Sequence, residues 1–247
     1  IEYGMLSDEK FCDRAMKFCL LKNTENKYFC IDDYKKAIEG EQTDKDKKVV
    51  FLYATDVDSQ YSFIEAAKNK GYDVLLLDCQ LDSHFVQLLE SKIENSRFAR
   101  VDSDSIDNLI PKDEKIKPEL SEEEQENLSI IFKTLLPKGN EYSVHADKLG
   151  AETAPILITQ SEFMRRYREM AAMGGGMNFY GELPEMYNIT VNMDNPLVEK
   201  IMTSKPENKE ELEAYAAGND VLRQITDLAL LANGMLKGKE LSDFIAR

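Results

Sequence analysis

Two runs of consecutive apolar residues constrain the fold of this chain more than any other feature. Residues 49–54 (VVFLYA) form an unbroken apolar stretch of strand length, and residues 73–78 (DVLLLD) contain a second one. Between them, Phe63, Ile64 and Ala67 recur at helical spacing before Gly71. Strands that are apolar at every position are buried on both faces, which is typical of parallel strands joined by crossover helices. We therefore predict that residues 1–112 form a small αβα unit with a short parallel sheet.

The rest of this first part is predicted as follows. A helix is expected over residues 7–21, where Phe11, Ala15 and Phe18 recur at helical steps. An extended piece over residues 28–31 precedes a second helix, which Asp32 or Asp33 caps and Gly40 ends. Residues 82–89 are expected to form a further helix.

A charged segment separates this part from the remainder. Residues 111–118 (PKDEKIKP) are bracketed by two prolines and are nearly free of apolar side chains, a composition typical of linkers. We place a linker at residues 113–119 and a second domain at residues 120–247.

The second domain is predicted to mix helices and strands. Ser121 and Glu124 form a capping box that opens a helix, which ends before Pro137. Alternating or apolar stretches at residues 142–146, 155–159 and 187–191 predict strands. Helices are expected from the Asn195-Pro196 cap to Lys205, and over residues 209–217, 220–233 and 240–246. The fold class is therefore α/β followed by α+β.

Charge and cysteine content restrict the possible partners. The chain has 31 Lys and Arg against 46 Asp and Glu, a net charge of -15, so phosphate backbones and anionic lipids would repel it. No apolar run approaches the ~20 residues that span a bilayer. We predict no nucleic-acid partner and no membrane insertion. Cysteines 12, 19, 30 and 79 lie in apolar stretches without CxxC spacing, which predicts buried thiols in a reducing cytoplasm rather than disulfides or zinc ligands.

Three acids follow the apolar strands. Asp56, Asp58 and Asp78 lie at the carboxyl ends of these strands, where open α/β sheets bind ligands, and they could hold Mg²⁺ for phosphoryl transfer. A stand-alone α/β metal-dependent enzyme is therefore one hypothesis. The competing interpretation is that Asp caps the following helices, since no glycine-rich phosphate loop is present.

The histidines offer weaker catalytic candidates. Cys79 and His84 have the residue types of a thiol nucleophile and its base, but the spacing shows neither an orienting third group nor a cleft. His145 falls in an alternating strand, and two histidines so far apart give no metal-ligand spacing. We predict no catalytic residue and no metal site from them.

A methionine-rich stretch is the most informative surface candidate. Residues 161–173 predict an amphipathic helix, and the glycine-rich residues after it carry more large apolar side chains. Flexible methionines fit many apolar partners, which favours a binding face, although an ordinary core helix and a membrane-surface helix are competing interpretations. The apolar members are Phe163, Met164, Tyr167, Met170, Met173, Met177, Phe179 and Tyr180.

The end of the chain carries a second apolar pattern. Its side chains recur three and four residues apart, and they either pack on their own domain or form a symmetric bundle with a second copy. The set is Val221, Leu222, Ile225, Leu228, Ala229, Ala232, Met235, Leu236, Leu241, Phe244 and Ile245.

Several segments together resemble the ninety-kilodalton heat-shock chaperones, in particular their bacterial HtpG type. These segments are residues 3–11 (YGMLSDEKF), 74–77 (VLLL) followed by Asp82, 98–102 (FARVD), 161–166 (SEFMRR) and 228–232 (LALLA). The resemblance covers essentially the whole chain, and the order and spacing of the segments carry it.

The resemblance implies a domain assignment and a function. Residues 1–112 correspond to the small distal part of the family's middle domain, and residues 120–247 to its C-terminal dimerization domain. The ATP-binding domain would lie before Ile1, so ATP and Mg²⁺ are expected cofactors of the full-length protein, and neither a cofactor nor enzymatic activity is expected in this piece. The absence of an acidic tail after Arg247 fits a bacterial, cytoplasmic member.

The family's interaction surfaces carry over onto the apolar sets above. The C-terminal set from Val221 to Ile245 would form the homodimer bundle, and the methionine-rich set would contact unfolded or partly folded client proteins. Client contact on the middle domain would fall at His84 and Phe85, where HtpG relatives place a tryptophan that this chain lacks.

Overall fold

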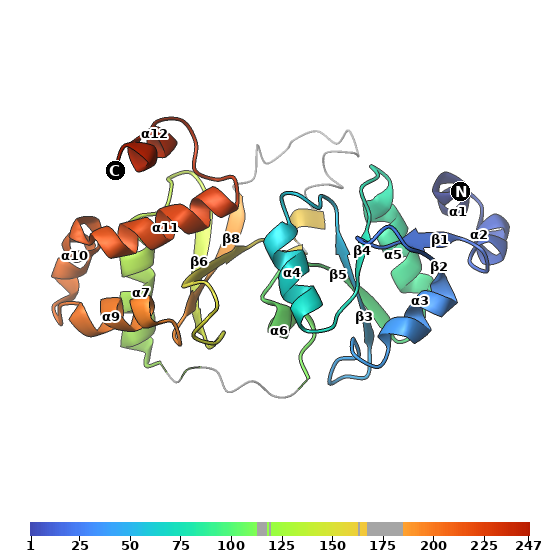
Figure 1. The fold of residues 1–247 in the computed structure, drawn as a ribbon, viewed down its shortest axis with the longest axis horizontal. Helices are drawn as coiled ribbons and strands as arrows, with labels where there is room; N and C mark the ends of the chain where they lie inside the picture. The colour runs from blue at the N-terminus through green and yellow to red at the C-terminus, as the bar shows by residue number, and fades with distance from the viewer. Residues whose placement is uncertain (113–117, 119, 163, 167–184) are drawn as a thin grey trace. The chain divides into compact units, whose positions relative to one another are not determined.

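The computed structural model describes residues 1–112, 118, 120–162, 164–166 and 185–247 (Figure 1). Backbone contacts divide the chain into two compact units. Unit 1 takes Ile1–Lys115 and Glu162–Gly176, and unit 2 takes Ile116–Ser161 and Met177–Arg247. Unit 1 is thus built from two separate parts of the sequence. Its second part lies inside the range 120–247 that we assigned to the second domain.

Three parallel strands form the centre of unit 1. β3 (Val49–Ala54) is the middle strand, and β4 (Val74–Leu76) and β5 (Ser96–Arg100) pair with it on its two sides. Every residue of β3 is buried, as expected for a strand that is apolar at every position. The predicted short parallel sheet is confirmed. β5 was not predicted, because Arg97 and Arg100 interrupt its apolar residues.

Helices cover both faces of this sheet, as Figure 1 shows. Alternate residues of β3 point to opposite faces, so Phe51 joins one core cluster and Leu52 the other. The Phe51 cluster includes side chains of α3 (Ile31–Ile38) and α5 (Asp82–Lys92). The Leu52 cluster includes those of α4 (Tyr61–Asn69) and α6 (Ile106–Leu109).

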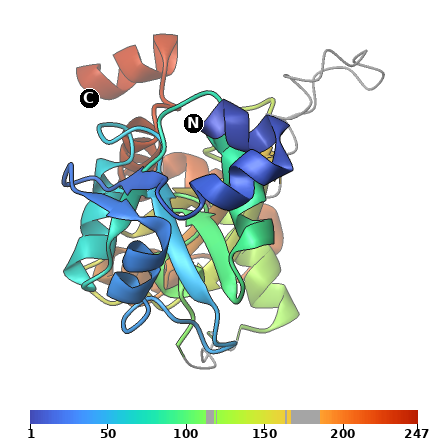
Figure 2. The same ribbon diagram turned by 90° about the vertical axis from the view of Figure 1, so that its right-hand side faces the viewer.

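The first thirty residues differ from the prediction. Instead of one helix over residues 7–21, the chain forms α1 (Glu2–Ser7), α2 (Glu9–Ala15) and a hairpin of β1 (Leu20–Lys22) with β2 (Tyr28–Cys30). Asp8 separates α1 from α2, because its side chain accepts the Phe11 N–H at 2.9 Å and caps α2. The predicted helix was too long at its other end, where residues 20–22 pair as a strand. Figure 2 shows α1 and α2 beside α5, against which α1 packs.

Unit 2 packs helices against a mixed three-stranded sheet. β8 (Met186–Asn192) is its middle strand and pairs parallel with β6 (Glu141–Asp147) and antiparallel with β7 (Ile156–Thr159). α7 (Glu122–Lys133) packs on β6, and α11 (Asp220–Ala232) packs against β7. The predicted capping box at Ser121 opens α7. The remaining elements are α9 (Pro196–Ser204), the 3-10 turn η1 (Lys209–Glu211), α10 (Leu212–Gly218) and α12 (Gly238–Ala246).

The cysteines are all free, but they are not all buried. Cys12 and Cys19 are buried, Cys30 is half-buried and Cys79 is exposed. The prediction of buried thiols is therefore wrong for Cys79, which lies in the turn between β4 and α5 rather than in a strand. Within the described part of the chain, no helix has both the length and the apolar composition needed to cross a membrane.

Candidate functional site

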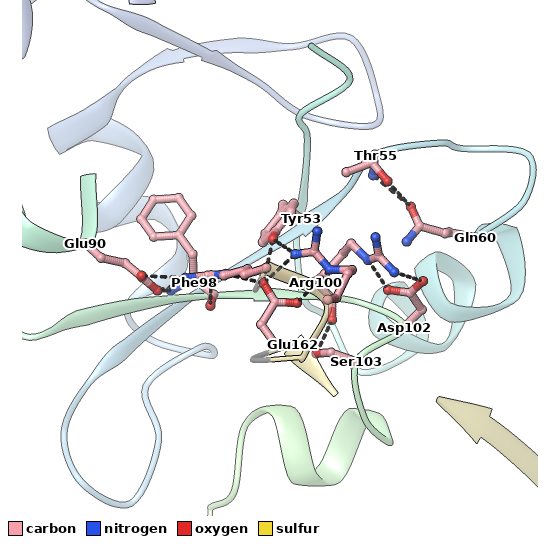
Figure 3. Close-up of polar contacts among 11 residues, drawn as sticks. Tyr53, Thr55, Gln60, Glu90, Phe98, Arg100, Asp102, Ser103 and Glu162 are labelled. Atoms are coloured by element: carbon pink, nitrogen blue, oxygen red, sulfur yellow. Dashed lines mark hydrogen bonds and ion pairs between the residues drawn. The ribbon is translucent and has the colours of Figure 1, made fainter. Parts of the chain in front are cut away.

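Five polar side chains of unit 1 form a compact group, here called the Glu162 cluster: Tyr53, Glu90, Glu162, Arg165 and Arg166. Figure 3 labels Tyr53, Glu90 and Glu162 among them. Tyr53 comes from β3 and Glu90 from α5, whereas the other three lie more than seventy residues further along the chain. Glu162, Arg165 and Arg166 stand three and four positions apart in helical backbone, so their side chains lie on one face.

The Glu162 carboxylate is the centre of the cluster. Its Oε1 accepts hydrogen bonds from Tyr53 Oη at 2.7 Å, from Arg165 Nη2 at 2.7 Å and from Arg166 Nε at 2.6 Å. Arg165 Nη2 also donates to Tyr53 Oη at 2.6 Å. One carboxylate oxygen therefore holds three side chains from two parts of the sequence.

Arg166 extends the cluster to the outer edge of β5. Its Nη1 donates to Glu90 Oε2 at 2.8 Å, and its Nη2 donates to the Phe98 carbonyl at 3.2 Å. Glu90 Oε1 in turn accepts the Phe98 N–H at 2.8 Å. Both backbone groups of Phe98 are thus hydrogen-bonded to side chains, at an edge where a neighbouring strand would otherwise pair.

The electrostatics of the cluster favour the protonated Tyr53 hydroxyl and the ionised Glu162 carboxylate. Burial and the neighbouring Glu162 raise the pKa of Tyr53, which keeps the hydroxyl protonated. Burial alone would raise the pKa of Glu162, but Arg165, the Tyr53 hydroxyl and Arg166 together lower it. Neither Tyr53 nor Glu162 is thus poised to exchange a proton near neutral pH, so this pair is suited to holding structure rather than to acid–base catalysis.

The three acids after the strands do not form a metal site. Asp56 Oδ1 accepts the N–H groups of Ser59 at 3.2 Å and of Asp58 at 2.9 Å. These hydrogen bonds lower the pKa of Asp56 and hold it in a turn. Asp78 is exposed. No group of three or more His, Cys, Asp or Glu among the described residues is placed to hold a metal ion. The arrangement therefore does not support the metal-enzyme hypothesis. The expected helix caps are wrong as well, since Gln60 and Leu81 stand at the N-cap positions of α4 and α5 and Asp56 closes a turn before α4.

The histidine candidates do not gather catalytic partners. The Cys79 N–H donates to Asp82 Oδ2 at 2.7 Å, and no bond between Cys79 and His84 is present within the described residues. His145 is exposed on β6, and its Nε2 lies 2.8 Å from Ser143 Oγ on the same strand.

Asp82 is a residue that sequence reasoning missed. It opens α5, is only 5% exposed, and burial raises its pKa to about 6 despite the hydrogen bond from the Cys79 N–H. Glu2 and Asp78 raise its pKa further. An acid after a strand predicts a cap, but its burial comes from the packing of α1 on α5, which the sequence pattern does not show.

The C-terminal apolar set separates into two groups. Leu222, Ile225 and Leu236 lie in the core of unit 2. Ala229, Met235, Leu241 and Phe244 are partly buried against that core. Val221, Leu228, Ala232 and Ile245 are exposed.

The exposed apolar members of α11 continue its buried stripe on one flank. Val221 is 38% exposed, Leu228 is 48% exposed and Leu231 is 40% exposed. At 100° per residue, Ala232, Val221 and Leu228 lie within about 60° of the buried Ile225, and Leu231 lies about 120° from it. We call Val221, Leu228, Leu231 and Ala232 the outer face of α11. The sequence pattern missed Leu231, although its spacing of three from Leu228 would have indicated it.

Most of the predicted client-binding residues lie outside the described part of the chain. They are Phe163, Tyr167, Met170, Met173, Met177, Phe179 and Tyr180. Met164 is described and is partly exposed, as is His84. Phe85 is 1% exposed and belongs to the Phe51 core cluster, so it is a packing residue rather than a client contact.

Comparison with known proteins relates the whole chain to one family. A family model described as Hsp90 protein matches residues 1–246. The chain is 41% identical to the chaperone protein htpG of Bacteroides fragilis and 40% identical to the HtpG chaperone of Porphyromonas gingivalis. Each alignment runs over 305 residues and covers 100% of this chain and 45% of the relative. An endoplasmin homolog of Dictyostelium discoideum is 23% identical over 233 residues, which cover 92% of this chain and 30% of that protein.

The chain therefore spans less than half the length of the bacterial relatives it matches. Because those alignments are longer than the 247-residue chain, the relatives also carry residues inside the matched region that have no counterpart here.

Proposed function

The chain belongs to the Hsp90 family of chaperones, and from this premise we propose that it supplies homodimerization and part of the client-binding surface of an ATP-dependent chaperone. On this proposal the ATP site is contributed by sequence outside this chain, and the chain itself does not hydrolyse ATP. We also propose that it acts in the cytoplasm, which is consistent with four free cysteines.

The outer face of α11 carries the dimerization proposal. α11 buries Leu222, Ile225 and Leu230 in its own unit, yet Val221, Leu228 and Leu231 on the flank of this buried stripe are exposed to solvent. A surface helix of a globular protein normally buries its apolar stripe against its own core. An apolar stripe that extends beyond the part its own unit covers is typical of a helix that also packs on a partner.

α12 supports the same proposal. It has no buried residue, and Ile245 is 73% exposed, although Leu241 and Phe244 touch the core of unit 2. Each large apolar side chain that moves from water into an interface contributes about 1.5–3 kcal/mol. In a twofold dimer every contact occurs twice, so an outer face of this size can support a stable pair of subunits.

The dimerization proposal is tested by charging the outer face of α11. In the double variant Leu228→Glu/Leu231→Glu, each symmetric interface would bury four carboxylates, which raises the dimer dissociation constant by at least roughly a thousandfold. Sedimentation velocity at tens of micromolar should show the wild type as dimer and the double variant as folded monomer.

The matched control is Leu197→Glu. Leu197 is 42% exposed on α9 of the same unit, so it has the same residue type and a similar exposure. This control should remain a dimer. A double variant that sediments like the wild type would show that the outer face of α11 is not the dimer contact.

Client binding is proposed for the methionine-rich residues 161–180. The support is their amphipathic sequence pattern and the family to which the chain belongs, together with the partly exposed Met164. His84 is proposed as a second contact, since it is partly exposed on α5. Phe85 is not, because it is buried.

The client proposal is tested with the triple variant Met164→Ser/Tyr167→Ser/Met170→Ser. Loss of three adaptable apolar side chains should weaken the capture of an unfolded model protein by at least roughly tenfold, while the dimer mass stays unchanged. Suppression of the aggregation of that model protein is the measurement. Unchanged suppression would mean that these side chains do not contact clients.

A further inference from the structure

The attachment of Glu162, Arg165 and Arg166 to unit 1 is almost entirely polar. Among the described residues, none from 162 to 166 belongs to the apolar core on that side of the sheet or packs against it as a partly buried apolar neighbour. Their contacts to unit 1 are instead the hydrogen bonds and ion pairs of the Glu162 cluster. This contrasts with α5 on the same face of the sheet, whose Phe85 and Leu89 are fully buried.

Such an attachment is specific but easy to release. Arg165 and Arg166 have side-chain exposures of 6% and 21%, and Glu162 and Glu90 have exposures of 21% and 26%, so the cluster lies at the margin of the unit. When both partners of an ion pair are hydrated together, the Coulombic loss is largely offset by regained solvation. Removal of one partner alone is different, because it leaves the other charge desolvated and unpaired.

Release would uncover a strand edge. The Phe98 carbonyl at the outer edge of β5 accepts its hydrogen bond from Arg166, and the Phe98 N–H donates to Glu90, which Arg166 also holds. By contrast, the Val101 N–H donates to the Tyr53 carbonyl at 2.9 Å and belongs to the sheet itself. The outer edge of β5 at Phe98 is therefore covered by a segment that comes from a distant part of the sequence.

The cluster begins almost directly after β7 in the sequence. β7 of unit 2 ends at Thr159, and Glu162 of unit 1 follows after only Gln160 and Ser161. The cluster thus lies directly where the chain passes from one unit to the other.

We propose that the Glu162 cluster is a latch, a charge-balanced attachment that fastens the residues after β7 to unit 1 and that opens locally, without unfolding the sheet, to expose the edge of β5 at Phe98. Neither dimerization nor client binding is needed for this proposal. The pivot is Glu162 Oε1, which Tyr53, Arg165 and Arg166 share.

The test is amide hydrogen exchange on the full 247-residue chain. Glu162→Gln keeps the shape of the side chain and removes the shared charge, so the amides of residues 162–166 and of Phe98 should exchange at least roughly tenfold faster. The Val101 amide should keep its wild-type rate. Glu152→Gln is the control, because Glu152 is an exposed carboxylate of unit 2, and it should change none of these rates.

A second, milder variant tests the latch in case Glu162→Gln does not fold. Tyr53→Phe removes only the hydroxyl and leaves the buried ring in place, so exchange at residues 162–166 should accelerate several-fold. Wild-type rates at residues 162–166 in both variants would overturn the latch. Equal acceleration at Phe98 and Val101 would also overturn it, because the cluster would then support the whole sheet rather than a local attachment.

Discussion

At the scale of single residues, burial changes the pKa of a side chain that the sequence does not mark as unusual. Asp82 has the position of a helix-opening acid, but the packing of α1 against α5 buries it. Burial raises its pKa to about 6, whereas an unfolded Asp titrates near 3.9. The folded chain therefore binds this proton more tightly than the unfolded chain does.

This difference gives a pH-dependent prediction for Asp82→Asn. A carboxyl with a raised folded pKa contributes stability that is present below the unfolded pKa and is lost as the pH rises through the folded pKa. At pH 7 the wild type is therefore destabilised by the buried charge, and Asn, which can still accept the Cys79 N–H, should be more stable by about 1–2 kcal/mol. The gain should shrink between pH 6 and pH 4 and vanish near pH 4.

Urea unfolding from pH 4 to pH 8 measures this gain. Asp46→Asn, at an exposed turn, is the matched control and should show no such pH-dependent gain. A constant difference between Asp82→Asn and wild type across the whole range would contradict the prediction.

The sequence predicts which side chains are apolar, but it does not predict which of them the protein's own core buries. The apolar set of α11 was recognised, yet Leu222 and Ile225 face their own core while Leu228 faces solvent. Periodicity locates an apolar stripe, but when the stripe is wide it cannot say which part of it the helix's own domain covers. For the same reason Phe85 was assigned to a surface that it does not reach.

At the scale of elements, the strongest local signals predicted best. The continuous apolar run of β3 and the capping box of α7 were both correct to the residue. β5 was missed because Arg97 and Arg100 interrupt its apolar pattern, and its strand identity depends on pairing with β3. The helix expected over residues 7–21 starts close to α2 but was predicted too long, because α2 ends at Ala15 and Leu20–Lys22 pairs with β2 instead.

The capping box of α7 gives an element-scale prediction. The Ser121 hydroxyl accepts the Glu124 N–H at 3.2 Å, and the Ser121 N–H donates to the Glu124 carboxylate at 2.8 Å. Ser121→Ala removes the first of these bonds and should lower the free energy of unfolding of unit 2 by about 1 kcal/mol. Amide exchange in α7 and β6 provides the measurement.

Ser129→Ala in the same helix is the matched control. It should be neutral or slightly stabilising, because Ala has the higher helix propensity in a helix interior. Equal destabilisation by the two variants would show that the cap contributes nothing specific.

At the scale of the whole molecule, the proposed function depends on contacts that a single chain does not contain. The family was recognisable from the order of short segments, and the comparisons show it. The Glu162 cluster was not predictable, because it joins residues 109 positions apart in the sequence and no local pattern records such a contact. The outer face of α11 became visible only after the structure showed which side of the helix its own unit covers.

The most direct test of dimerization through that outer face is the solution mass of the unmodified chain. Sedimentation equilibrium from one to one hundred micromolar should give a mass close to twice 28.2 kDa at the upper concentrations. A mass that stays at 28.2 kDa over the entire range would contradict the account, because the apolar side chains of α11 and α12 would then remain in water.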